Sequence, residues 1–131
     1  MSGAGTLDDK RILVVDDDAS MRLLIRRMLA RMGIANVVEA ASGAEALQLL
    51  ATAPVDLVMC DWNMPAMSGM ELFARARPLK PDLLFLMLTG RADAESHAAA
   101  RKAGVAAFMV KPISAADLKS QLSHLLGARL G

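Results

Sequence analysis

Five short apolar runs alternate with five amphipathic runs along the chain, and this alternation constrains the fold more than any other feature. The apolar runs, which we interpret as strands, are Ile12–Val15, Val37–Ala40, Leu57–Cys60, Leu83–Leu88 and Ala107–Val110. Runs without polar alternation are typical of parallel strands that are covered on both faces. The pattern therefore predicts an α/β fold, a doubly wound five-stranded parallel sheet with five helices on its two faces.

The helix boundaries are marked by capping signals. Ser42, Ser68 and Ser114 are each followed three residues later by an acidic residue, as in a capping box. The first helix is indicated by apolar residues at helical spacing between Met21 and Met32. A fourth helix is expected from about residue 93 to a C-cap at Gly104, and the fifth from about 114 to 126.

Length and composition indicate one domain. The chain has 131 residues, of which 54% are hydrophobic, enough for one substantial core. Residues 10–127 form the expected domain, between a flexible N-terminal tail at 1–9 and a short C-terminal tail at 128–131. The start lacks the basic and apolar regions of a signal peptide, and no apolar stretch reaches the ~18 residues of a membrane span.

Charge and cysteine content narrow the class further. Cys60 is the single cysteine, which excludes an internal disulfide framework and a CxxC metal site and favours a cytoplasmic protein. The net charge of +1 gives no general attraction to nucleic acid. We therefore expect neither a nucleic-acid partner nor a membrane partner.

Polar residues follow the predicted strands at the points where they end. Asp16, Asp17 and Asp18 follow the first strand, and Asp61 follows the third. Thr89 and Lys111 follow the fourth and fifth. Ligand sites of open α/β sheets lie beyond the carboxyl ends of the strands. With a sheet order of 2-1-3-4-5, these four strands would be neighbours and their ends would meet.

The chemistry of this cluster points to phosphoryl transfer. Carboxylates that lie close together repel one another unless a cation neutralises them, and oxygen ligands without His or Cys select Mg²⁺. Lys111 supplies a second positive charge and Thr89 a hydrogen-bond donor. Asp61, central on the third strand, is the best candidate nucleophile, forming an acyl phosphate.

These residues resemble the receiver domains of two-component response regulators, especially the single-domain chemotaxis type. The matching fragments, spread over residues 10–127, are Asp16-Asp17 after Ile-Leu-Val-Val, Asp61 in Asp-Trp-Asn-Met-Pro, Gly69 in Met-Ser-Gly, Thr89-Gly90 and Lys111-Pro112. The resemblance implies the flavodoxin-like sheet order 2-1-3-4-5, a known property of that family. It also implies a cis Lys111–Pro112 bond.

The resemblance implies roles for individual residues. Asp61 would accept a phosphoryl group from a histidine kinase or a histidine phosphotransfer protein, assisted by Thr89 and Lys111. Mg²⁺ would be bound by the Asp17 and Asp61 side chains, by the Asn63 carbonyl, and by Asp16 mostly through water.

Movement of Thr89 and inward motion of Phe108 would switch the surface formed by the fourth helix, the strand Ala107–Val110 and the fifth helix, where a downstream target would bind. Asn63 and Arg91 flank the expected path of an attacking water and would set the lifetime of the phosphate. Trp62 is expected to be partly exposed, and His97 and His124 are interpreted as surface residues.

Three alternatives stay open at this level. A haloacid-dehalogenase-type phosphatase also uses an aspartate nucleophile with Mg²⁺, but Asn63 stands where its acid would be. A pseudo-receiver would bind partners without phosphorylation, which the intact residue set argues against. The chain could also be cut from a longer regulator. We expect a monomer that catalyses only its own phosphorylation and dephosphorylation.

Overall fold

The computed structural model describes residues 10–90 and 94–127, and in these ranges strands and helices alternate as predicted. The elements are β1 (Ile12–Val15), α1 (Ala19–Arg31), β2 (Val37–Ala40), α2 (Gly43–Thr52), β3 (Leu57–Asp61), α3 (Gly69–Ala76), β4 (Leu84–Thr89), α4 (Ala94–Ala103), β5 (Ala107–Val110) and α5 (Ala115–Leu126). The predicted tails at 1–9 and 128–131, and the predicted start of α4 at residue 93, lie outside the described residues.

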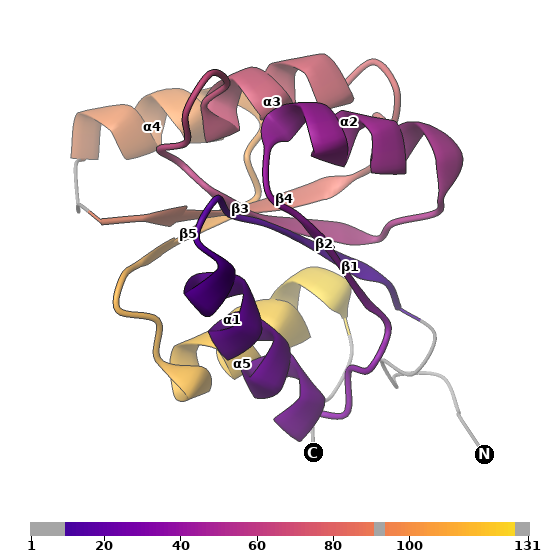
Figure 1. The fold of residues 1–131 in the computed structure, drawn as a ribbon. Coiled ribbons are helices and arrows are strands. Elements are labelled where there is room, and N and C mark those ends of the chain that lie inside the picture. The colour runs from indigo at the N-terminus through magenta and orange to yellow at the C-terminus, as the bar shows by residue number, and fades with distance from the viewer. Residues whose placement is uncertain (1–9, 91–93, 128–131) are drawn as a thin grey trace.

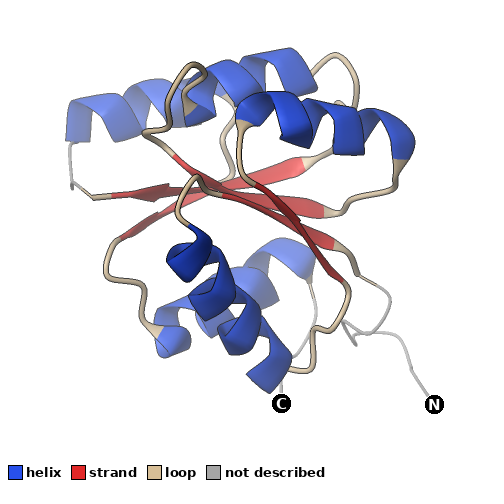
Figure 2. Cartoon of the chain, in the orientation of Figure 1, coloured by secondary structure: helices blue, strands red, loops and turns tan. Residues whose placement is uncertain are grey.

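The strands form one parallel sheet in the order β2-β1-β3-β4-β5. Helices α1 and α5 cover one face, and α2, α3 and α4 cover the other, so the molecule has three layers (Figure 1; Figure 2). This confirms the predicted fold class and sheet order. No helix of the described residues is both long and apolar enough to cross a bilayer.

The two core layers explain why the strands read as continuous apolar runs. In β1, Ile12 and Val14 pack toward α1 and α5, whereas Leu13 and Val15 pack toward the opposite helices. All four side chains are fully buried. Successive strand residues point to opposite faces of the sheet. When helices cover both faces, every residue of the strand is buried, and each position therefore favours an apolar side chain.

The predicted caps form as local hydrogen bonds. Ser42, Ser68 and Ser114 each accept a bond from the backbone N–H three residues later. Gly104 follows α4 with a φ of +115°, a conformation that a side chain disfavours. The three serines begin their helices, and Gly104 ends α4, at the predicted positions. The strand predictions differ from the structure by at most one residue at either end.

Candidate functional site

The sheet order brings four strand ends to one edge. Asp61 is the last residue of β3 and Thr89 the last of β4, while Asp16 and Lys111 directly follow β1 and β5. In the strand register, Cys60 is opposite Val15, and Asp61 is opposite Leu88. The residues that the sequence placed at strand ends are therefore neighbours in space, as expected for a doubly wound sheet.

Lys111 connects the two buried carboxylates. Its Nζ lies 3.4 Å from Oδ2 of Asp16 and 3.2 Å from Oδ1 of Asp61. Asp16 is 1% exposed and Asp61 8% exposed, so this cluster is almost withdrawn from water. One ammonium thus compensates two buried negative charges, and the exposed Asp17 adds a third beside them.

The ionisation of the cluster reflects this imbalance. Burial raises the pKa of Asp61 above its usual value of 3.8, and the Asp16 carboxylate adds to the rise, although Lys111 and the Asn63 backbone N–H oppose it. Burial alone would lower the pKa of Lys111, but the two carboxylates outweigh it and the pKa is raised. Asp61 holds its proton more firmly mainly because burial disfavours its carboxylate, and Lys111 holds its proton more firmly because two carboxylates lie beside it.

The donor set fits a hard divalent cation. One carboxylate oxygen from each of Asp16, Asp17 and Asp61 lies within 4.8 Å of the other two. Cys60, the nearest sulfur in sequence, is fully buried, and burial raises the pKa of its thiol, so it stays a protonated core residue. Carboxylates without imidazole or thiolate ligands fit Mg²⁺ better than zinc.

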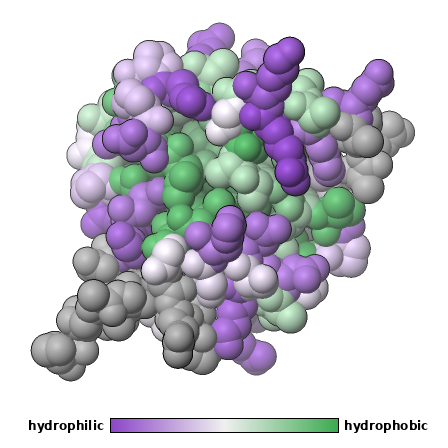
Figure 3. Space-filling model, turned by 180° about the vertical axis from the view of Figure 1, so that it is seen from behind, coloured by the Kyte–Doolittle hydropathy of each residue, from purple (hydrophilic) through white to green (hydrophobic). Residues whose placement is uncertain are grey.

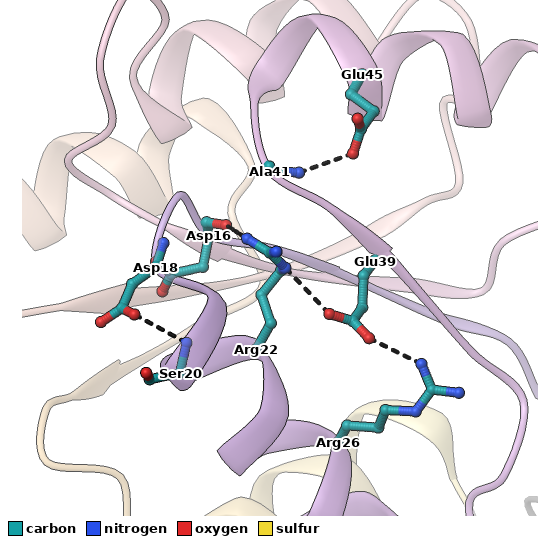
Figure 4. A network of polar contacts seen from close by, with 8 residues as sticks. All are labelled: Asp16, Asp18, Ser20, Arg22, Arg26, Glu39, Ala41 and Glu45. Atoms are coloured by element: carbon teal, nitrogen blue, oxygen red, sulfur yellow. Dashed lines mark hydrogen bonds and ion pairs between the residues drawn. The ribbon is translucent and has the colours of Figure 1, made fainter.

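The loop after β1 is held by hydrogen bonds on both sides (Figure 4). Oδ1 of Asp16 accepts a bond of 2.9 Å from the Asp18 N–H, and the Asp18 side chain caps α1 through the Ser20 N–H. Arg22 donates a 2.7 Å bond to the Asp16 carbonyl and pairs with Glu39 on β2. Sequence reasoning missed this role of Arg22, because the bond connects a helix to the loop that precedes it.

The loop after β3 is fastened to its neighbours through the backbone. The Trp62 N–H donates to the Leu88 carbonyl at 2.8 Å, and the Gly69 N–H donates to the Trp62 carbonyl at 2.9 Å. A Cβ on Gly69 would lie 2.6 Å from the Asp61 carbonyl oxygen, closer than real contacts allow. Gly69 is therefore required here by close approach of α3 to the backbone of Asp61.

The loop after β5 aims Lys111 into the cluster. The Lys111 N–H donates a 2.7 Å bond to the Thr89 carbonyl, which ties the ends of β4 and β5 together. The Lys111–Pro112 bond is cis, which confirms the expectation from the resemblance. Thr89 itself is 7% exposed at the same edge.

The structure confirms the predicted exposure of Trp62 and His124 but not that of His97, which lies beside Phe108. Phe108 is 9% exposed in the core, Trp62 is partly exposed as predicted, and His124 lies on the surface. His97, interpreted as a surface residue, is instead half-buried and stacks on Phe108. The sequence signal is the spacing of three residues between His97 and the apolar Ala100, which places both on one face of a helix; the structure shows that Ala100 is buried. Arg91 lies outside the described residues.

Comparison with known proteins decides the family. The family model described as the response regulator receiver domain matches residues 12–123. The chain belongs to the response regulator receiver domain family. It is thus a phosphoacceptor signalling domain of two-component systems, and its fold and strand-end cluster agree with that membership.

Individual receiver domains are similar over nearly their whole length. The chain is 39% identical over 117 residues to chemotaxis protein CheY-3 of Vibrio cholerae, covering 88% of this chain and 90% of that protein. It is 39% identical over 124 residues to the chemotaxis protein CheY homolog of Campylobacter jejuni, covering 92% and 95%.

Solved structures give the same result. The Vibrio cholerae chemotaxis protein CheY4 superposes with a TM-score of 0.82 at 30% identity, covering 88% of this chain and 98% of that one. The response regulator TrrA of Thermotoga maritima, solved in complex with Mg²⁺-BeF, superposes with a TM-score of 0.79 at 31% identity, with the same coverage.

Proposed function

We propose that Asp61 is the phosphoacceptor of this receiver domain and takes its phosphoryl group from a histidine kinase or a histidine phosphotransfer protein. The observation that carries this proposal is the Asp61 carboxylate at the end of β3, held 3.2 Å from Lys111 beside the buried Asp16. In the transfer, the P–N bond of the donor phosphohistidine breaks as an O–P bond forms to a carboxylate oxygen of Asp61. Lys111 and Thr89 would stabilise the negative charge on the transferred group.

Mg²⁺ is the cofactor that the donor set supports. The Asp17 and Asp61 carboxylates and the Asn63 carbonyl would hold it, and Asp16 would contribute mostly through water. When bound, the ion neutralises charge on the phosphoryl oxygens. The Mg²⁺-BeF complex of the relative TrrA supports this assignment. The exposed Asn63, together with Arg91, would set the lifetime of the phosphate.

The phosphoacceptor is tested with a small-molecule donor. Acetyl phosphate and Mg²⁺ should add one phosphoryl group to the wild-type chain, measured by intact-mass spectrometry, and chelation of Mg²⁺ should prevent this. Asp61→Asn should abolish the addition, whereas Asp18→Asn, which changes the exposed helix cap, should retain it. Incorporation at the normal rate in Asp61→Asn would refute the assignment.

We propose the surface of α4, β5 and α5 as the output face. Figure 3 views the molecule from the side where these elements lie, and apolar side chains gather near the centre of that view with hydrophilic ones around them. A groove of ≈ 360 Å³ between β5 and α5 is lined by Phe108, Met109, Val110, Asp117, Ser120 and Gln121. Val110 is 41% exposed, although it belongs to a strand. A downstream target would cover this apolar area, and the nearby Arg101 and Lys102 favour one that carries acidic residues.

Hydrogen exchange tests the output face without a known target. Mg²⁺ with beryllofluoride, a phosphoryl mimic, should change amide protection in α4, β5 and α5 more than in α2. Phe108→Ala should reduce that change while leaving phosphate uptake close to normal. An unreduced change in Phe108→Ala would leave Phe108 as a core residue only.

The relatives supply the biological setting. Because the matched curated relatives are chemotaxis proteins, we propose control of motility or a related phosphorelay for this chain. It would act as a cytoplasmic monomer and catalyse only its own phosphorylation and dephosphorylation. A phosphatase function has no support, since Asn63 cannot serve as a general acid.

A further inference from the structure

Three rings from three separate elements meet beside the phosphoacceptor loop. The His97 ring of α4 stacks on the Phe108 ring of β5, with centroids 4.4 Å apart and planes inclined by 4°. Trp62, directly after Asp61, lies 6.2 Å from His97 and 6.1 Å from Phe108. We call Trp62, His97 and Phe108 the three-ring cluster. The guanidinium of Arg101, one turn after His97, lies 5.4 Å from the centroid of the Phe108 ring.

Stacking rather than hydrogen bonding accounts for the position of His97. Its Nε2 is buried and has no hydrogen-bond partner within residues 10–90 and 94–127. A buried polar atom without a partner destabilises the conformation that contains it. The imidazole nevertheless stacks parallel to Phe108, with the centroids 4.4 Å apart, close to the lower end of the range of roughly 4.5–7 Å that attractive ring pairs occupy. The ring contacts therefore offset the loss at Nε2.

We propose that His97 is a positioning residue for the Phe108 switch. Its ring holds Phe108 in the buried position against Trp62 and so links α4 to the Asp61 loop. The inference rests on the proposed function and on the inward motion of Phe108 that the family resemblance implies for the phosphorylated state. It goes beyond that function by naming the side chain that sets how readily this chain switches.

The placement of the cluster explains how the link would operate. Trp62 follows the phosphoacceptor directly, and Phe108 lies three residues before Lys111, so both backbones lead into the reaction site. His97 belongs to α4, which forms part of the proposed output face. Removing the His97 ring takes away one partner of the stack and leaves the backbone at Trp62 and at Phe108 unchanged.

The size of the effect follows from linkage. The stack stabilises the arrangement of Phe108 that binds the phosphoryl group best. Loss of the stack therefore lowers the affinity for a phosphoryl mimic by the factor by which the stack favours that arrangement. A stacked pair of rings typically contributes about a 2- to 12-fold factor. Substitution of a residue that only packs, with no effect on the switch, would change the free energy of unfolding and leave the affinity for the mimic unchanged.

The experiment compares His97→Ala, which removes the ring, with His97→Phe, which keeps a ring and removes the unpartnered nitrogen. His124→Ala on the exposed side of α5 is the matched control. Beryllofluoride affinity in the presence of Mg²⁺ is measured by calorimetry. We expect His97→Ala to bind about 2- to 12-fold more weakly, and His97→Phe and His124→Ala to bind like the wild type.

A second readout reports the stack directly. The chain has three phenylalanines, so 4-fluorophenylalanine labelling gives three ¹⁹F resonances, of which Phe108→Leu identifies one. His97→Ala should move the Phe108 resonance, because the ring above it is lost. Phe73 and Phe85, which pack edge to face on each other at 5.1 Å, should keep their resonances.

The outcomes separate the two proposals. If the wild-type chain binds beryllofluoride and His97→Ala binds it equally well or more tightly, the role of His97 is overturned and the proposed function stands. An unmoved Phe108 resonance in His97→Ala also overturns it. If the wild-type chain neither binds beryllofluoride nor takes up phosphate, the proposed function fails and this inference fails with it.

Discussion

At the scale of single residues, Asp61 carries a charge that its surroundings disfavour. Burial and the nearby Asp16 raise its pKa in spite of Lys111. A carboxyl whose pKa is raised on folding contributes stability only while it is protonated, and this contribution is lost as the pH rises through the folded pKa. At neutral pH and without metal, ionised Asp61 therefore makes the fold less stable than a neutral group of the same shape would.

This predicts a pH-dependent gain in stability for Asp61→Asn. With a chelator present, the variant should have a larger free energy of unfolding than the wild type at neutral pH. The difference should shrink as the pH falls through the raised pKa of Asp61 toward the usual value of 3.8, because the folded and the unfolded chain then both carry the proton. Urea unfolding across this pH range measures the effect.

Asp82→Asn is the control for this prediction, because Asp82 is an exposed carboxyl in the turn before β4. Its substitution should change the free energy of unfolding little. A loss of stability in Asp61→Asn at neutral pH would contradict the electrostatic account of the cluster.

At the scale of elements, α3 and the end of β3 support each other through one close approach. The Gly69 N–H bonds to the Trp62 carbonyl, and a Cβ at Gly69 would lie 2.6 Å from the Asp61 carbonyl oxygen. The Ser68 and Glu71 capping box fixes the start of α3 at the same point. The helix therefore cannot move away without breaking its cap or the loop bond.

Gly69→Ala should therefore destabilise the protein by about 1–3 kcal/mol, as expected for an inserted methyl group without space. Since the Trp62 backbone would have to shift, the Trp62 emission spectrum should change as well. Gly90→Ala is the matched control, because a Cβ there meets no atom within 4 Å in the part of the chain that the structure describes. Equal unfolding free energies for the two variants would contradict the packing argument.

At the scale of the whole molecule, the proposed metal site joins the ends of separate strands. Asp16 and Asp17 follow β1, and Asp61 ends β3, so these carboxylates come together only in the folded chain. A ligand that binds only the folded state raises its stability by mass action, by about 2.7 kcal/mol at a concentration of 100 times Kd.

Mg²⁺ should therefore raise the unfolding temperature of the wild-type chain in a concentration-dependent way, measured by scanning calorimetry. Asp17→Asn removes one proposed ligand from an exposed position and should weaken this response without lowering stability in a chelator. Asp18→Asn should leave the Mg²⁺ response intact. Equal responses in the two variants would argue against Asp17 as a ligand.

The local features of this protein could be predicted from the sequence alone. Apolar runs, serine caps and Gly104 act through neighbours a few residues away. The strands therefore lie within one residue of their predicted bounds, and α2, α3 and α5 begin directly after the predicted serine caps. The polar residues at the strand ends also indicated the site, because parallel strands place their carboxyl ends at one edge. The strand order that makes those ends neighbours came from the family resemblance.

Other features were decided by the tertiary structure. The bond of Arg22 to the Asp16 carbonyl and the stack of His97 on Phe108 depend on how α1 and α4 are rotated against the sheet. That rotation follows from the packing of whole helix faces, to which each side chain contributes little. The sequence determined which residues have the chemistry for phosphoryl transfer, whereas the packing decided which side chains hold them in place.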